Sequence, residues 1–108
     1  EAKQIAQKLL SNGSKKVIIT MAEKGSLFLA TEGEQQEIYT PAYKVNAVDT
    51  TAAGDAFCGA LATALAKNNS ISDSLKFASA AGALATTKAG AVPSIPSQTE
   101  INKLIANN

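Results

Sequence analysis

The alternation of helix-like segments with short apolar runs restricts the fold of this chain more than any other feature. Residues 1–11 carry apolar side chains at helical spacing, and Asn12-Gly13 is suited to end a helix there. The β-branched run at 17–20 then has the composition of a strand buried in a parallel sheet. An αβ unit is therefore predicted at the start of the chain.

The rest of the chain continues the mixture of strands and helices. Residues 26–30 and 37–40, each preceded by a glycine, predict a two-stranded antiparallel ribbon. Further helices are predicted over about 53–66, 72–87 and 98–106, with loops at 68–70 and 90–93. This order favours a layered α/β fold with a mostly parallel sheet and an antiparallel edge ribbon over a helical bundle.

Composition excludes several kinds of chemistry. With no His and one Cys among 108 residues, the chain cannot form a Ser-His triad, a Cys-His pair or a Cys/His zinc site, so carboxylates must transfer any proton. We expect Cys58 to be a small buried hydrophobe and the compartment to be a reducing cytoplasm. Scattered charges with a net charge of +1 indicate neither nucleic acid nor membrane as a partner.

The segment 49–55, Asp-Thr-Thr-Ala-Ala-Gly-Asp, forms a turn of small residues that enters a predicted helix. The first amides of a helix lack intrahelical acceptors and can converge on an anion, and the helix dipole favours negative charge there. Asp55 could simply complement that dipole. Beside a bound phosphate it could instead accept the proton of an attacking hydroxyl, with Asp49 bracketing the loop from the other side.

Three segments in order resemble the ribokinase family, the phosphofructokinase B type of carbohydrate kinases. The stretch VDTTAAGDAF resembles the family signature DTTGAGD, with Ala52 where Gly is more usual. VIITMAEKG resembles the nucleotide strand and loop VxxTxGxxG, with Ala22 in place of the middle Gly. KFASAAGALATTKAGAVPSIPS resembles the carboxyl-terminal helix and loop. The resemblance implies a ribokinase-like fold, of which residues 1–108 are the carboxyl-terminal nucleotide-binding and catalytic part.

The resemblance also implies roles for individual residues. Asp55 would be the catalytic base toward the sugar hydroxyl, and the backbone amides of Ala52, Ala53 and Gly54 would form an anion hole with that of Asp55. ATP would be contacted by the following residues: Thr20, Met21, Ala22, Glu23, Lys24, Gly25, Gly54, Asp55 and Ser79. A monovalent cation such as K⁺ would be held, mostly by carbonyl oxygens, at Asp49, Thr51, Ala85, Lys88, Gly90 and Ser94. Mg²⁺ would accompany ATP, held mostly by phosphates and water.

The activity implied is transfer of the ATP γ-phosphoryl group to a sugar, with D-ribose as the preferred acceptor. The sugar-binding part and the lid of the family would precede this chain, and a homodimer would form through that part. A kinase of another sugar or nucleoside remains an alternative, as does a nucleotide-binding fragment without catalysis. A dinucleotide oxidoreductase is disfavoured because no Gly-x-Gly-x-x-Gly follows the first strand.

Overall fold

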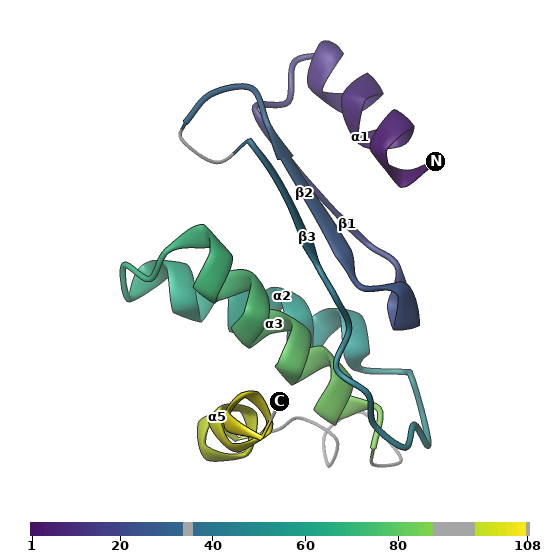
Figure 1. The fold of residues 1–108 in the computed structure, drawn as a ribbon, viewed down its shortest axis with the longest axis vertical. Helices are drawn as coiled ribbons and strands as arrows, with labels where there is room; N and C mark the ends of the chain where they lie inside the picture. The colour runs from purple at the N-terminus through teal and green to yellow at the C-terminus, as the bar shows by residue number, and fades with distance from the viewer. Residues whose placement is uncertain (34–35, 88–96, 108) are drawn as a thin grey trace. The chain divides into compact units, whose positions relative to one another are not determined.

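The computed structural model describes residues 1–33, 36–87 and 97–107, and it divides into two compact units (Figure 1). The first unit is Glu1–Pro41 and the second is Ala42–Asn108. Among the described residues, no helix has both the length and the apolar character needed to cross a membrane.

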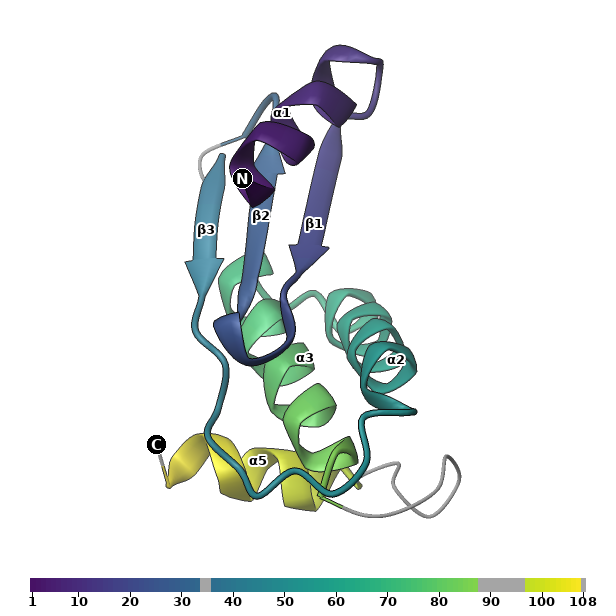
Figure 2. The same cartoon turned by 90° about the vertical axis from the view of Figure 1, so that its right-hand side faces the viewer.

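The first unit is a helix packed on a three-stranded sheet. Helix α1 (Ala2–Ser11) precedes the strands, which lie in the order β1-β2-β3 and are antiparallel throughout (Figure 2). The strands have the following bounds: β1 Lys16–Thr20, β2 Ser26–Ala30 and β3 Glu37–Thr40. Gly13, with a φ of 114°, supplies the left-handed residue predicted after the first helix.

The core of this unit lies between α1 and one face of the sheet. Side chains alternate across a strand, so Leu27 and Leu29 of β2 point to the same face. Val17 faces Leu29 across the β1–β2 pair, and Ala6 of α1 packs against them. Partly buried apolar side chains extend this cluster: Ala2, Leu10, Ile19 and Met21. The predicted helix and strands are therefore joined by one apolar layer.

Strand β1 pairs on one side only within the described residues, with β2, and this pair is antiparallel. The run at 17–20 was expected to belong to a parallel sheet. The edge of β1 that does not face β2 has no strand partner among the described residues, so this expectation stays a prediction, while the pair with β2 places Val17 opposite Leu29. Only residues 21–25 connect the two strands. A parallel pair needs a crossover of a dozen or more residues, so this connection permits only the antiparallel arrangement. The antiparallel ribbon at 26–30 and 37–40 is confirmed and gains β1 as a third strand.

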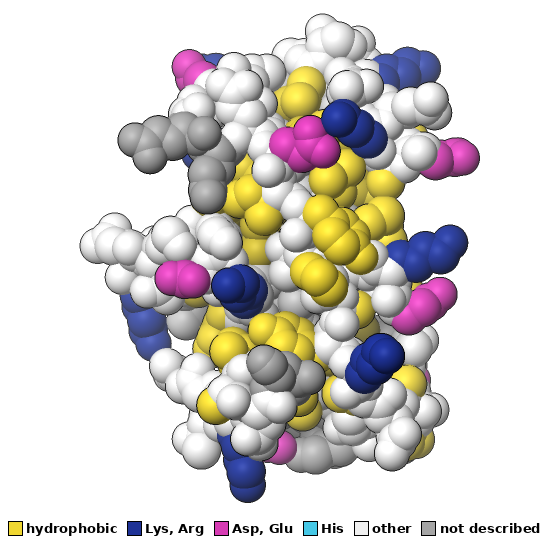
Figure 3. All heavy atoms as spheres, viewed as in Figure 1, with side chains coloured by type: hydrophobic (Ala, Val, Ile, Leu, Met, Phe, Trp, Pro, Cys, Tyr) yellow, Lys and Arg dark blue, Asp and Glu magenta, His cyan; other side chains and the backbone are white. Residues whose placement is uncertain are grey.

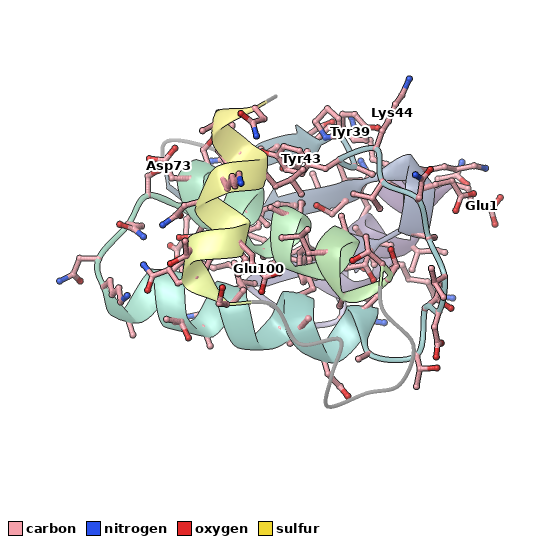
Figure 4. All side chains as sticks on the ribbon, turned by 90° about the horizontal axis from the view of Figure 1, so that it is seen from below. Glu1, Tyr39, Tyr43, Lys44, Asp73 and Glu100 are labelled. Atoms are coloured by element: carbon pink, nitrogen blue, oxygen red, sulfur yellow. The ribbon has the colours of Figure 1, made fainter. Side chains whose placement is uncertain are left out.

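The described residues of the second unit form three helices. Helix α2 spans Ala53–Ala66 and α5 spans Gln98–Ala106, both as predicted, while α3 spans Ile71–Ala85. Ser70 caps α3 by accepting a hydrogen bond from the Asp73 amide. Ser97 and Glu100 form a capping box at α5. Figure 4 shows Asp73 and Glu100 in the first turns of these two helices. These caps explain why both helices begin where they do.

Small residues allow the helices of this unit to pack closely. Ala80 and Ala81 of α3 are buried against Ile101 of α5, and α3 also lies along α2 (Figures 1 and 2). At Gly82 a Cβ atom would lie 3.3 Å from the carbonyl oxygen of Ala53, in the first turn of α2. Gly82 therefore lets the start of α2 approach α3 closely, while Ala80 and Ala81 do the same for α5.

Tyr43 precedes α2 and packs at the edge of the same core. Partial burial raises the pKa of its phenol, because burial disfavours the ionised form.

On the face shown in Figure 3, side chains of both charge signs are interspersed, which agrees with the scattering of charge along the sequence.

The expectation that Cys58 is buried was wrong, because the thiol is exposed. In α2 the buried positions are Phe57 and Ala64, which are seven residues apart and share one face of the helix. Each residue turns the helix by about 100°, so Cys58 lies away from the buried face.

Candidate functional site

The loop that leads into α2 is anchored to the end of α3 by its backbone. The carbonyl oxygen of Thr86 accepts hydrogen bonds from the amides of Val48, at 2.6 Å, and Asp49, at 2.9 Å. Thr86 is itself buried. This contact brings together two segments that are separated by more than 35 residues, and it places Asp49 beside the end of α3.

Asp49 also organises the turn that follows it. One carboxylate oxygen, Oδ1, accepts a hydrogen bond of 2.9 Å from the Thr51 amide and another from the Thr51 hydroxyl. A side chain that bonds the backbone two residues later forms an Asx turn, which fixes the local chain direction. The Asp49 side chain thus fixes the turn that leads into α2. These hydrogen bonds hold Asp49 at the start of the 49–55 loop, at the opposite end from Asp55.

The first turn of α2 presents free amides. The Ala53 amide donates to the Thr50 carbonyl at 3.2 Å, and the Ala56 amide donates to Ala52 at 2.9 Å. The amides of Gly54 and Asp55 make no hydrogen bond to any residue that the structure describes, and both residues are exposed. Ala52 is buried. The exposed donors of the predicted anion hole are therefore those of Gly54 and Asp55.

Asp55 lies in this same first turn with an exposed side chain. Within the described ranges its carboxylate makes no hydrogen bond or ion pair. Asp55 does not cap α2, because the N-cap position is Ala52 and the start of α2 has no side-chain capping hydrogen bond. A carboxylate without an internal partner, next to two free amides and the positive end of a helix dipole, is available to a bound molecule.

Ala52 stands where the family signature usually has Gly, and its backbone explains why this is tolerated. Its φ of −101° and ψ of 6° are accessible to any residue. The departure from the signature at this position therefore leaves the geometry of the turn intact.

Ala22 stands at the other departure, and here the backbone is strained. Residues Ala22–Lys24 form a short 3₁₀ turn, η1, between β1 and β2. Ala22 has a φ of 53°, in the left-handed region that an L residue with a Cβ atom adopts at a cost. Gly25, with a φ of 90°, completes the turn. The usual Gly at position 22 thus has a conformational reason.

We therefore predict that Ala22→Gly stabilises the full-length protein by about 1 kcal/mol, because it removes the left-handed strain. The matched control is Ala52→Gly, at a position whose φ is negative. Ala52→Gly should lower the free energy of unfolding, because glycine raises the conformational entropy of the unfolded chain and relieves no strain at this position. Urea denaturation of the two variants measures both effects. Equal destabilisation by both substitutions would contradict the strain at Ala22.

The remaining predicted residues are found in different places. Ser79 is half-buried in α3, and Ala85, the last residue of α3, is buried. Thr20 ends β1 and is exposed. Lys88, Gly90 and Ser94 lie outside the described residues. The Thr20–Gly25 segment belongs to the first unit and the other described site residues to the second.

The predicted cation ligands can be tested for fit in part. The bonds from Val48 and Asp49 to Thr86 bring the carbonyl-bearing segments at 49–51 and 85–86 together. Within the described ranges, no three His, Cys, Asp or Glu side chains cluster as a metal site would require. Backbone carbonyl oxygens are suitable ligands for a hard cation, so a monovalent ion at this set stays a prediction.

Two contributions escaped prediction from the sequence. The Thr86 carbonyl anchors the loop through its backbone, and such a contact leaves no signal in residue identity. Gly82 lets the start of α2 lie close to α3. A glycine inside a predicted helix is a sequence signal of such close packing.

A family model described as pfkB family carbohydrate kinase matches residues 1–98. Ribokinase of Staphylococcus aureus (strain COL) is 44% identical over 103 residues, which cover 94% of this chain and 33% of the relative. Fructokinase-1 of Zea mays is 38% identical over 108 residues, with 94% and 32% covered. Deoxyribokinase of Salmonella typhi is 36% identical over 103 residues, with 95% and 33% covered. The chain spans about a third of the length of these relatives.

Solved structures agree with these relatives. Ribokinase of Arabidopsis thaliana complexed with ribose and ATP has a TM-score of 0.87 at 35% identity, with 95% of this chain and 33% of that chain covered. A putative ribokinase II of E. coli in complex with ATP and Mg²⁺ has a TM-score of 0.88 at 27% identity, with 98% and 33% covered.

Phosphofructokinase-2 of Escherichia coli in complex with potassium has a TM-score of 0.80 at 28% identity, with 97% of this chain and 33% of that chain covered. The ribokinase-like α/β fold is thereby confirmed. The matched family model and the relatives together show that this chain belongs to the pfkB family of carbohydrate kinases.

Proposed function

We propose that the protein carrying this chain is an ATP-dependent sugar kinase that converts D-ribose to ribose 5-phosphate. The observation that carries the proposal is the first turn of α2, where Asp55 has an exposed carboxylate beside the free amides of Gly54 and Asp55. Phosphoryl transfer requires these two elements, a base for the hydroxyl proton and donors for the charge on the transferred group.

In the proposed reaction the primary hydroxyl oxygen of the sugar forms a bond to the γ-phosphorus of ATP. The bond from that phosphorus to the β,γ-bridging oxygen breaks, and ADP leaves with the bonding electrons. The hydroxyl proton passes to the carboxylate of Asp55. The amides of Gly54 and Asp55 stabilise the negative charge on the phosphoryl oxygens, helped by the dipole of α2.

The turn of the first unit, residues 20–25, is assigned to ATP on the family resemblance, as is Ser79. Support for ATP and Mg²⁺ comes from related structures that hold ATP, in one case with Mg²⁺. We assign the ion to the phosphates of ATP and to water rather than to a cluster of side chains of this chain.

Ribose is chosen as acceptor because a ribokinase relative has a higher identity to this chain than the fructokinase or deoxyribokinase relative. A panel of D-ribose, 2-deoxyribose and D-fructose tests the choice in the full-length protein, with kcat/KM measured by coupled release of ADP. We expect the highest kcat/KM with ribose. A higher value with either other sugar would reassign the acceptor, and no sugar-dependent release of ADP would contradict the kinase itself.

We also predict that potassium chloride supports a higher kcat than sodium chloride at equal ionic strength. The cation would be held by carbonyl oxygens of Asp49, Thr51 and Ala85, together with Lys88, Gly90 and Ser94. Its positive charge would help order the anion-binding loop, which Asp49 already shapes. Titration of each salt in a steady-state assay measures the effect. Equal rates in both salts would count against this site.

A further inference from the structure

Tyr39 in β3 reaches the turn that connects β1 and β2. Its phenolic hydroxyl donates a hydrogen bond of 2.7 Å to the carbonyl oxygen of Lys24. Tyr39 is 55% exposed, so core packing does not explain its placement (Figure 4). Among the described residues, no other side chain makes a hydrogen bond to residues 20–25.

The turn needs such support because it is strained. Ala22 holds a left-handed backbone, and the turn is closed by a hydrogen bond of 2.8 Å from the Met21 amide to the Gly25 carbonyl. The Lys24 amide donates to the Met21 carbonyl at 3.0 Å, and the Gly25 amide donates to the Ala22 carbonyl at 3.1 Å. A residue in a sparsely populated conformation persists only where its surroundings hold it there.

Two backbone amides of the turn take no part in these internal hydrogen bonds. The amides of Ala22 and Glu23 make no hydrogen bond to a described residue, and both residues are exposed. The φ angle at Ala22 sets the direction of the Glu23 amide relative to the Ala22 amide, because it orients the peptide that follows Ala22. A group that holds the Lys24 carbonyl therefore restricts the turn that carries both donors.

We propose that Tyr39 is a positioning residue for ATP, which acts by clamping the Lys24 carbonyl and so fixing the turn at Ala22–Lys24. The inference rests on the proposed function, in which this turn contacts the nucleotide. Tyr39 acts through the turn alone, and the chemical step is assigned to Asp55, so Tyr39 sets the affinity for ATP and leaves the chemical step unchanged.

The test is Tyr39→Phe in the full-length protein, with ATP binding followed by calorimetry and kcat and KM measured in steady state. Loss of one hydrogen bond should raise both the Kd and the KM for ATP by about threefold to tenfold. The kcat at saturating ATP and the KM for ribose should stay unchanged. A merely structural role would instead lower thermal stability without this selective change.

The matched control is Tyr43→Phe, because Tyr43 is the other tyrosine of the chain. Its hydroxyl makes no hydrogen bond with a described residue, so its removal should leave ATP affinity unchanged. Adding Ala22→Gly to Tyr39→Phe should restore part of the affinity, because the turn then no longer carries the left-handed strain. If the double variant binds ATP no better than Tyr39→Phe alone, the proposed link between the strain at Ala22 and the Tyr39 hydrogen bond is contradicted.

The outcomes separate this proposal from the function on which it rests. If the wild-type protein binds ATP and Tyr39→Phe binds it equally well, the positioning role is overturned and the kinase assignment stands. If the wild-type protein does not bind ATP, the proposed function falls and the positioning role falls with it. A selective rise in the Kd and KM for ATP supports both.

Discussion

Asp55→Asn in the full-length protein is expected to lower kcat by about 10²-fold to 10⁴-fold, the range that a positioned general base contributes. Asparagine keeps the size and shape of the side chain but cannot accept the hydroxyl proton. The carboxylate is exposed and has no partner among the described residues, so its removal leaves no internal ion pair broken. Steady-state kinetics with ATP and ribose measures the loss.

The matched control is Asp73→Asn. Asp73 occupies the third position of α3, as Asp55 does in α2, and both carboxylates lie in a first turn where they complement a helix dipole. If Asp55 served only the dipole, the two variants would lose similar small amounts of stability and keep full turnover. Full activity in Asp55→Asn would therefore contradict its assignment as the base.

Gly54→Pro is expected to lower kcat by about 10²-fold to 10³-fold, as removal of one anion-hole donor does in other enzymes. Proline removes the backbone N–H while the first turn of a helix tolerates its ring. The Gly54 amide makes no hydrogen bond to a described residue, and a Cβ at Gly54 would meet no described atom within 4 Å. The activity loss should therefore exceed any loss of stability.

The control for this change is Ser72→Pro, at the second position of α3, which matches the position of Gly54 in α2. Both substitutions restrict the preceding residue in the same way, so their effects on folding should be similar. Thermal unfolding and kcat are measured together for each variant. Comparable losses of kcat in the two variants would show that the Gly54 amide has no special part in catalysis.

The helices of this chain follow from its sequence because local signals agree with one another. Ser97 with Glu100 forms a capping box, and Ser70 caps α3, so the starts of α3 and α5 are marked by short-range chemistry. The antiparallel pairing of β1 with β2 does not follow from composition, because β-branched residues suit both parallel and antiparallel strands. The short connection at 21–25 decides the matter, and that signal was present in the sequence.

The candidate site could be predicted where it depends on residue type and less well where it depends on backbone. Asp55 and the small residues before it are visible in the sequence. The bonds of Val48 and Asp49 to the Thr86 carbonyl are not, because any residue can supply a carbonyl. The two alanines at family glycine positions also look alike in sequence, yet Ala22 is left-handed and Ala52 is not. Only backbone dihedral angles separate a tolerated change from a strained one.

The proposed function depends most on transfer of the phosphoryl group to a sugar, with Asp55 as the base. Phosphorus NMR of the full-length protein with ATP, Mg²⁺ and ribose follows this transfer directly. We expect a phosphomonoester signal of the sugar to grow as fast as the γ-phosphate signal of ATP disappears, and we expect Asp55→Asn nearly to abolish this growth. Release of inorganic phosphate without a sugar phosphate, or equal growth in Asp55→Asn, would contradict the proposed function.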